Sequence, residues 1–152
     1  MAIRNIVQVG DDVLRKKSAP VEQFDAKLAA LLDDMKETLK EADGAGLAAV
    51  QVGVLRRAFV VDVKEGYFEF VNPVLVKTKG RQVGEEGCLS VRGKYGTVER
   101  PRMVEIRAFD RNGREFALKA YDFFARAVCH EYDHLDGVLY IDKATELKND
   151  GK

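Results

Sequence analysis

The 152-residue sequence contains two histidines, two cysteines, three prolines and no tryptophan. Two cysteines are too few for a disulfide scaffold, and a thiol used as a metal ligand favours a reducing compartment. No apolar run approaches the roughly 18 residues of a membrane span, and the first residues lack the apolar segment of a signal peptide. The 25 basic and 25 acidic residues cancel, and a net charge of zero does not indicate a nucleic-acid partner. The sequence therefore predicts a cytoplasmic protein with no membrane segment and no direct nucleic-acid site.

The length suits a single domain over residues 1–152 with a substantial core. Apolar residues recur at helical spacing between Asp25 and Ala42, which predicts an amphipathic helix capped by Asp25. A second helix is expected at 123–136, capped by Asp122 and closed by Gly137. Strands are expected at 57–63, 67–76, 97–100, 103–110 and 114–120, with a bulge or edge at Asn72-Pro73 and a loop at 92–96. Strands in the middle with helices on either side predict an α+β fold.

The only two histidines, His130 and His134, stand four residues apart with Glu131 between them. On a helix this spacing places both imidazoles on one face, about 5–6 Å apart at Cβ. Two such imidazoles can share one divalent cation, and the carboxylate can act on a water beside the metal without being a ligand. The alternative is that two surface histidines lie on an amphipathic helix.

Two histidines make an incomplete metal site, so a third ligand is required. No histidine follows His134, and only Glu146 remains before a polar end that is expected to fray. Cys129 is adjacent to His130, so on a helix it points about 100° away and is expected to pack as a small apolar residue. Cys88 lies in a glycine-flanked stretch and is the expected third ligand. One Cys and two His leave an open coordination position, which is typical of catalytic sites.

A glycine-containing run of small residues precedes the expected strands. Gly44 and Gly46 leave the main chain bare, so another backbone can come close. For Gly44 alone, a helix end with a tight turn is the simpler interpretation. Gln51 is a lone amide among small apolar residues, and it must either find a polar partner or supply one.

Three stretches, Gly44–Gln51, Glu86–Ser90 and His130–His134, resemble in this order the three signature motifs of the peptide deformylases: G-x-G-L-A-A-x-Q, E-G-C-L-S and H-E-x-D-H. The similarity continues into the flanking residues and covers nearly the whole chain. It implies the deformylase fold, in which antiparallel sheets pack around the motif helix. It also implies a hydrolase of protein biosynthesis that removes the formyl group from the formyl-methionine of nascent polypeptides and releases formate.

The resemblance further implies a metal and a reaction. The metal would be Fe²⁺ held by Cys88, His130 and His134, with Zn²⁺, Ni²⁺ or Co²⁺ as substitutes. The nucleophile would be a water whose pKa the cation lowers. Glu131 would take its proton and return it to the departing amine.

The oxyanion would be stabilised by the cation, by the Leu89 backbone N–H and by the side-chain amide of Gln51, which would account for an amide in an apolar run. The family places the peptide as an added strand beside the glycine-containing run. The methionine side chain would fill an apolar pocket. The residues expected to bind the peptide are Gly44, Ala45, Gly46 and Ala127, with Phe123 or Arg126 at the edge of the pocket.

Two carboxylates and two departures from the family pattern complete the expected site. Glu86 and Asp133 are expected to orient the ligands and the backbone. Arg92 stands where proline is common, which is expected to reshape the loop that flanks the substrate. Cys129 stands where glutamine is common, and one hypothesis is that this second thiol makes an iron site more sensitive to oxidation.

Two other functions stay open. A metallopeptidase shares H-E-x-x-H, although it normally takes a downstream third ligand. A non-enzymatic metal or redox module could use the Cys and the two His, but it gives no role to Glu131 or Gln51. The expected partners are formyl-methionyl nascent peptides. Because the sequence stops soon after Asp142, any contact with the ribosome near its exit tunnel is expected to be made without the C-terminal docking helix of some relatives.

Overall fold

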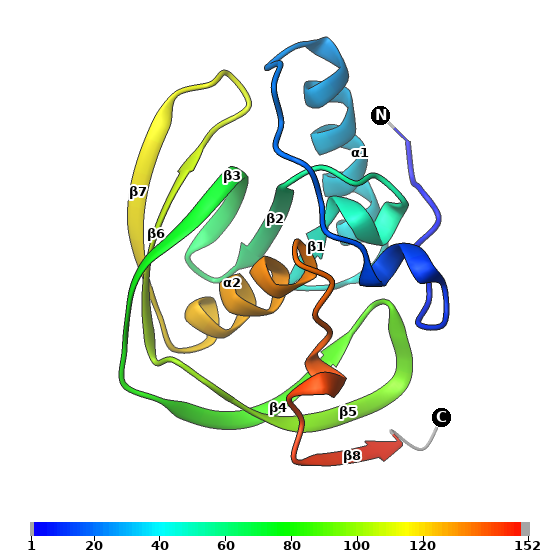
Figure 1. The fold of residues 1–152 in the computed structure, drawn as a ribbon, viewed down its shortest axis with the longest axis vertical. Helices are drawn as coiled ribbons and strands as arrows, with labels where there is room; N and C mark the ends of the chain where they lie inside the picture. Colours follow the sequence, from blue (N-terminus) through cyan, green and yellow to red (C-terminus); the bar gives the residue numbers. More distant parts are fainter. Residues whose placement is uncertain (1, 150–152) are drawn as a thin grey trace.

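The structure is a computed structural model and describes residues 2–149. The larger of two antiparallel sheets has a helix on each face, and the second of these helices also packs against the smaller sheet (Figure 1). The elements are α1 (Ala26–Ala42), β1 (Gly46–Ala48), β2 (Ala58–Val63), β3 (Gly66–Lys79), β4 (Gln82–Cys88), β5 (Val91–Arg100), β6 (Met103–Phe109), β7 (Glu115–Tyr121), α2 (Asp122–His134) and β8 (Glu146–Asn149), with short 3-10 helices η1 (Asp12–Arg15), η2 (Ala49–Val52) and η3 (Tyr140–Asp142). The predicted α+β class is confirmed. None of the helices within residues 2–149 has the length and apolar character needed to span a membrane.

Helix α1 forms where the apolar spacing predicted it. The Asp25 side chain accepts a hydrogen bond from the Leu28 N–H, which caps the first turn. The helix ends at Asp43, whose left-handed backbone (φ 55°) stops the α-helical pattern. Its buried stripe packs against one face of β1 and β2, including Leu47 and Val60. Burial of this stripe is the main reason why the segment is helical.

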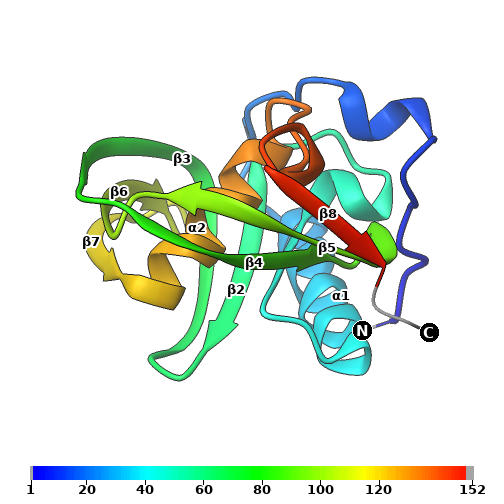
Figure 2. The ribbon, with the colours of Figure 1, turned by 90° about the horizontal axis from the view of Figure 1, so that it is seen from below.

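The two sheets are built from strands that continue from one sheet into the other. The larger sheet has the order β1-β2-β3-β6-β7, and the smaller has β4-β5-β8. Strand β3 leads into β4 through residues 80–81, and β5 leads into β6 through 101–102. The two passages are joined by a hydrogen bond from the Arg102 N–H to the Lys79 carbonyl, 3.1 Å. Figure 2 shows the smaller sheet from below, with β8 beside β5.

Helix α2 lies between the two sheets (Figure 1). Phe124 and Val128 belong to the apolar cluster on the α2 side of the larger sheet. Arg126 points to the smaller sheet, where it donates to the Val98 carbonyl, 3.1 Å. The helix begins at Asp122 with no side-chain cap and ends at His134, so the expected cap at Asp122 and the expected end at residue 136 were wrong. The helix that carries the H-E-x-x-H motif is therefore buried on two sides.

Several strands differ from the expectation. Residues 92–96, expected as a loop, belong to β5, and β4 was not predicted. Residues 148–149, from the end that was expected to fray, pair with β5 as part of β8, whereas 150–152 lie outside the described residues. Gly96 permits this pairing, because a Cβ there would lie 2.7 Å from the Glu146 carbonyl oxygen. The expected irregularity at Asn72-Pro73 is confirmed by a register shift between Val71 and Val74.

Candidate metal centre and active site

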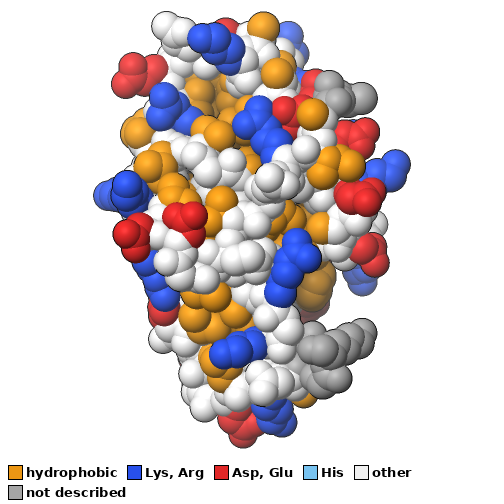
Figure 3. All heavy atoms as spheres, turned by 90° about the vertical axis from the view of Figure 1, so that its right-hand side faces the viewer, with side chains coloured by type: hydrophobic (Ala, Val, Ile, Leu, Met, Phe, Trp, Pro, Cys, Tyr) orange, Lys and Arg blue, Asp and Glu red, His pale blue; other side chains and the backbone are white. Residues whose placement is uncertain are grey.

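The two histidines are buried inside the molecule. No histidine side chain is visible on the face shown in Figure 3, where small apolar patches alternate with charged side chains. His130 is 8% exposed and His134 0%, and their ring centroids lie 5.2 Å apart on consecutive turns of α2. Cys88 ends β4, and its Sγ lies 3.4 Å from His134 Nε2. One donor atom from each of the three residues lies within 4.8 Å of the others, so the fold brings the predicted ligand set together.

The chemistry of this donor set fits a divalent cation. A thiolate and two imidazoles suit Fe²⁺, Zn²⁺, Ni²⁺ or Co²⁺. His130 Nδ1 lies 2.9 Å from Glu86 Oε1, which leaves Nε2 as the nitrogen for a metal. Burial and the neighbouring His130 lower the pKa of His134 well below its usual range, so this imidazole is neutral as a ligand must be. Among residues 2–149 the group consists of one Cys and two His, and three protein ligands are typical of catalytic metal sites.

Glu131 is a buried carboxylate beside the ligand cluster. Its side chain is 5% exposed, and Oε2 lies 4.0 Å from His130 Nε2. Burial raises the pKa of Glu131 to about 7, against the opposing effect of His130. Oε1 is buried with no hydrogen-bond partner among the described residues. A buried, unpartnered carboxylate oxygen costs free energy, and such groups are typical of active sites.

Gly46 makes room for this carboxylate. A Cβ at Gly46 would lie 2.5 Å from Glu131 Oε2 and 2.8 Å from its Cγ. The sequence predicted that another backbone could approach the bare main chain here. The structure adds that the missing side chain accommodates Glu131.

A buried network of charged side chains contacts His130 at Nδ1 through Glu86. Glu86 accepts hydrogen bonds from Arg100 Nε and Nη2 at 2.8 and 2.9 Å and from Arg126 Nη1 at 2.7 Å. Arg100 also donates to Asp133 Oδ2, 2.7 Å. Burial disfavours the ionised form of Glu86, but the hydrogen bonds from Arg100 and His130 outweigh it and lower the pKa of Glu86.

Sequence reasoning missed Arg100. It lies at the end of β5 in a polar stretch that carries no motif. The signal available was indirect: two carboxylates, Glu86 and Asp133, were expected to orient buried groups, and a buried carboxylate needs a cationic or hydrogen-bonding partner.

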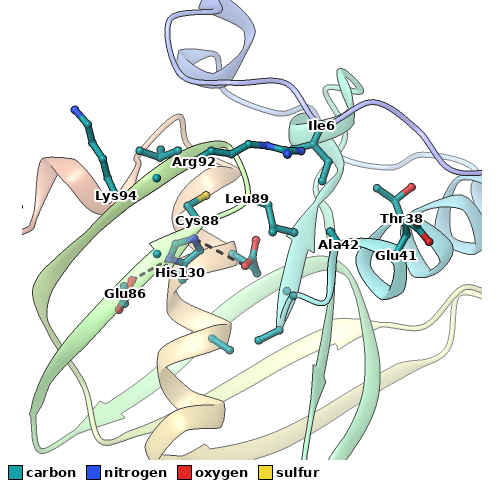
Figure 4. A pocket seen from close by; sticks show the side chains of 18 of the residues that line it. Ile6, Thr38, Glu41, Ala42, Glu86, Cys88, Leu89, Arg92, Lys94 and His130 are labelled. Atoms are coloured by element: carbon teal, nitrogen blue, oxygen red, sulfur yellow. Dashed lines mark hydrogen bonds and ion pairs between the residues drawn. The ribbon is translucent and has the colours of Figure 1, made fainter. Parts of the chain in front are cut away.

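A cavity of about 710 Å³ opens beside these groups (Figure 4). The predicted residues that line it are Gly44, Ala45, Gly46, Glu86, Cys88, Leu89, Phe123, Arg126, Ala127, His130 and Glu131, together with Arg92. Gln51 and His134 do not line the cavity and lie buried behind it. Lining residues that the sequence did not predict include Ile6, Thr38, Glu41, Ala42 and Lys94. Arg92 extends over the mouth toward Ile6 (Figure 4).

Gln51 has the polar partners that its position required. Its Oε1 accepts from the Ala48 N–H at 2.9 Å, and its Nε2 donates to Ser90 Oγ at 3.0 Å. The same nitrogen lies 3.5 Å from Cys88 Sγ. The Leu89 N–H, in the turn after Cys88, has no hydrogen-bond partner within residues 2–149. The amide of Gln51 thus lies near the Cys88 thiol, and Leu89 follows Cys88 directly in the chain.

Cys129 packs as the sequence predicted, as a small apolar residue. It is 5% exposed and belongs to the cluster that joins α2 to the larger sheet. Burial raises the pKa of its thiol to about 11. A thiol in such surroundings is mostly protonated at neutral pH and weakly nucleophilic.

Comparison with known proteins identifies the family of the chain. The family model described as polypeptide deformylase matches residues 3–150. A peptide deformylase of Caldicellulosiruptor bescii is 57% identical over 143 residues, which cover 94% of this chain and 86% of that protein. A peptide deformylase of Clostridium botulinum is 52% identical over 146 residues, 96% of this chain and 99% of that protein.

The fold is also similar to that of solved structures. The crystal structure of a peptide deformylase from Thermotoga maritima has a TM-score of 0.93 at 37% identity and covers 96% of this chain and 100% of that one. The structure from Legionella pneumophila has a TM-score of 0.92 at 42% identity, with 95% and 87% covered. The predicted deformylase fold is confirmed. The chain therefore belongs to the polypeptide deformylase family, and it is an enzyme that removes the N-formyl group from nascent peptides.

Proposed function

We propose that the chain, acting as a single domain over residues 1–152, hydrolyses the formyl amide at the metal site of Cys88, His130 and His134, with Glu131 as the general acid and base. The observation that carries the proposal is the convergence of the three donor atoms within 4.8 Å, next to a buried carboxylate on the wall of the cavity. Neither of the other two functions accounts for all of it. A metal or redox module needs no carboxylate with an unpartnered oxygen, and a peptidase normally takes its third ligand downstream of the helix.

The cation proposed is Fe²⁺, with Zn²⁺, Ni²⁺ or Co²⁺ able to replace it, because a thiolate with imidazoles suits all four. When bound, the cation supplies a Lewis acid that polarises the formyl carbonyl and lowers the pKa of water. Glu86 fixes the ring of His130 through Nδ1 and so directs Nε2 to the site. Metal analysis of protein purified without oxygen tests the choice of Fe²⁺.

Glu131 moves the proton in this proposal. Its carboxylate accepts a proton from the attacking water and returns it to the amine of methionine as the C–N bond breaks. The geometry supports this role, because Oε1 has no partner within the described chain and Oε2 faces His130 Nε2 at 4.0 Å. Water enters from the cavity, which Glu131 lines.

Two hydrogen-bond donors and one free strand edge complete the substrate site. The Leu89 N–H and the Gln51 amide stabilise the negative charge that develops on the formyl oxygen. Strand β1 is at the edge of the larger sheet, and it follows directly on the Gly44–Gly46 wall of the cavity. A peptide can therefore add to this edge as a further strand, with its methionine side chain toward Ala127.

Release of formate from a formyl-Met-Ala peptide tests the proposal, with the unformylated peptide and a longer formylated peptide as comparisons. We expect formate from both formylated peptides and no internal cleavage. Glu131→Gln should lower kcat by 100-fold or more while metal content stays unchanged. Internal cleavage would favour the peptidase, and unchanged activity of Glu131→Gln would contradict the role of Glu131.

We also propose that the enzyme acts in the cytoplasm and meets its substrates as they leave the ribosome near its exit tunnel. The support is the substrate class, because formylated N-termini exist on chains that are still being made. Cosedimentation of the purified protein with translating ribosomes at physiological salt tests the ribosomal contact.

A further inference from the structure

The segment 6–9, which belongs to none of the three motifs, joins two of them. The Val7 N–H donates to the carbonyl of Gln51 at 2.7 Å, and the Val9 N–H donates to the carbonyl of Ser90 at 2.7 Å. The segment therefore holds η2 and the β4–β5 turn by their main chains. These are the two places from which the proposed oxyanion donors come.

Between these two backbone hydrogen bonds, the side chain of Gln8 makes a third hydrogen bond to the turn. Its Nε2 donates to the carbonyl of Leu89 at 3.0 Å and lies 3.3 Å from the carbonyl of Ile6. Gln8 is half-buried, and it does not line the cavity. Both carbonyls of the Leu89-Ser90 turn are thus bound by the same outer segment.

The Cys88–Val91 pair closes the turn, but the pairing before it is irregular, so hydrogen bonds from outside the hairpin add to what holds the turn. The β4–β5 pairing loses its regular register between Glu86 and Cys88, directly before the turn. The turn has only two residues, and one of them carries the proposed donor, the Leu89 N–H. Removing a single oxyanion donor costs about 10²–10³ in kcat, and a shift of about 1 Å in a reacting group can cost 10²-fold.

We propose that Gln8 is a positioning residue for deformylation: its side-chain amide holds the Leu89 carbonyl, which fixes the turn and the direction of the Leu89 N–H. Gln8 touches neither the substrate nor the metal ligands. The inference rests on the proposed function, since it assigns Gln8 to the oxyanion site of that reaction. Its signature is a loss in kcat with little change in KM, because the donor acts on the charge that develops in the transition state.

Three variants of the full-length, metal-loaded enzyme test the role. Gln8→Glu keeps the shape, loses the N–H donor and sets a carboxylate against two carbonyl oxygens. Gln8→Lys keeps a donor of similar reach. Gln23→Glu makes the same change at an exposed glutamine outside the site. Formate release from formyl-Met-Ala-Ser is measured together with metal content, thermal midpoint and amide hydrogen exchange of residues 88–91.

We expect Gln8→Glu to lower kcat about tenfold with KM changed less than threefold, and to increase hydrogen exchange of the turn about fivefold. Gln8→Lys should stay within threefold of the wild type, and Gln23→Glu should match it. The role is refuted if Gln8→Glu leaves kcat and exchange unchanged, if its kcat falls only in proportion to metal content, or if Gln8→Lys is as slow as Gln8→Glu. Failure of the wild type to release formate would contradict the proposed function instead, and hydrogen exchange would still show whether Gln8 holds the turn.

Discussion

Replacing Gly46 by alanine is expected to displace the carboxylate of Glu131 and to slow deformylation about 100-fold. The added Cβ would lie 2.5 Å from Oε2, 2.8 Å from Cγ and 2.9 Å from Cδ of Glu131. Non-bonded carbon atoms are normally about 3.5–4.0 Å apart, so the carboxylate must retreat by roughly 1 Å. The same crowding should lower the free energy of unfolding by about 1–3 kcal/mol, because the site is buried.

The assay is the initial rate of formate release by the wild type, Gly46→Ala, Glu131→Gln and the double variant. In the Glu131→Gln background the carboxylate is already absent, so Gly46→Ala should cost less than about threefold there. KM for the formyl peptide should change little, because alanine keeps the main-chain groups of β1. The reasoning is refuted if Gly46→Ala keeps more than a third of the wild-type kcat. It is also refuted if the 100-fold loss recurs in the Glu131→Gln background, which would indicate damage to peptide binding.

Three further outcomes are expected. Glu86→Gln should lower the free energy of unfolding by about 3 kcal/mol at pH 7 in a urea titration, because it leaves Arg126 buried without its anion and Arg100 with Asp133 as its only acidic partner. The pKa of Glu86 is lowered in the fold, so its contribution to stability is fully present above the unfolded-state pKa of about 4.3 and is lost as the pH falls below it. The stability difference between the wild type and Glu86→Gln should therefore shrink between pH 5 and pH 3. A constant difference would argue against the assignment. Cys88→Ala should abolish tight binding of Co²⁺, measured by equilibrium dialysis, and wild-type affinity in this variant would exclude Cys88 as a ligand. Cys129→Ala should be inactivated by peroxide at the wild-type rate, because burial raises the pKa of the Cys129 thiol to about 11, whereas a slower rate would support the oxidation hypothesis.

The sequence predicted the elements whose pattern is local. The stripe of α1 and its Asp25 cap are encoded within one segment, and so are the apolar run of β2 and the alternating residues of β6. Strands β4 and β5 were missed or shortened because glycines and charged residues hide the alternation. The two strands pair with each other, and β5 also pairs with β8, which is distant in the sequence. Sheet edges of this kind are fixed by tertiary contacts that no short window contains.

The residues of the site also divide into those that a local sequence pattern indicates and those that only the fold brings together. The residue types and spacing of the motif indicated His130, His134 and Glu131, and the structure brings Cys88 to them from 42 residues away. Arg100 could not be found, because its role arises only when β5 passes next to Glu86. Gln8 was missed for the same reason, since its hydrogen bond joins residues 81 positions apart.

The three proposed ligands come from different parts of the fold, and this affects the stability of the protein in a cell. Cys88 belongs to the smaller sheet, whereas His130 and His134 belong to the helix that packs on the larger one. An ion bound by all three would link the smaller sheet to the helix on the larger sheet, and its binding free energy would add to the free energy of folding. Scarcity of the metal would then lower the amount of intact enzyme as well as its turnover, since chains that open more often are degraded sooner.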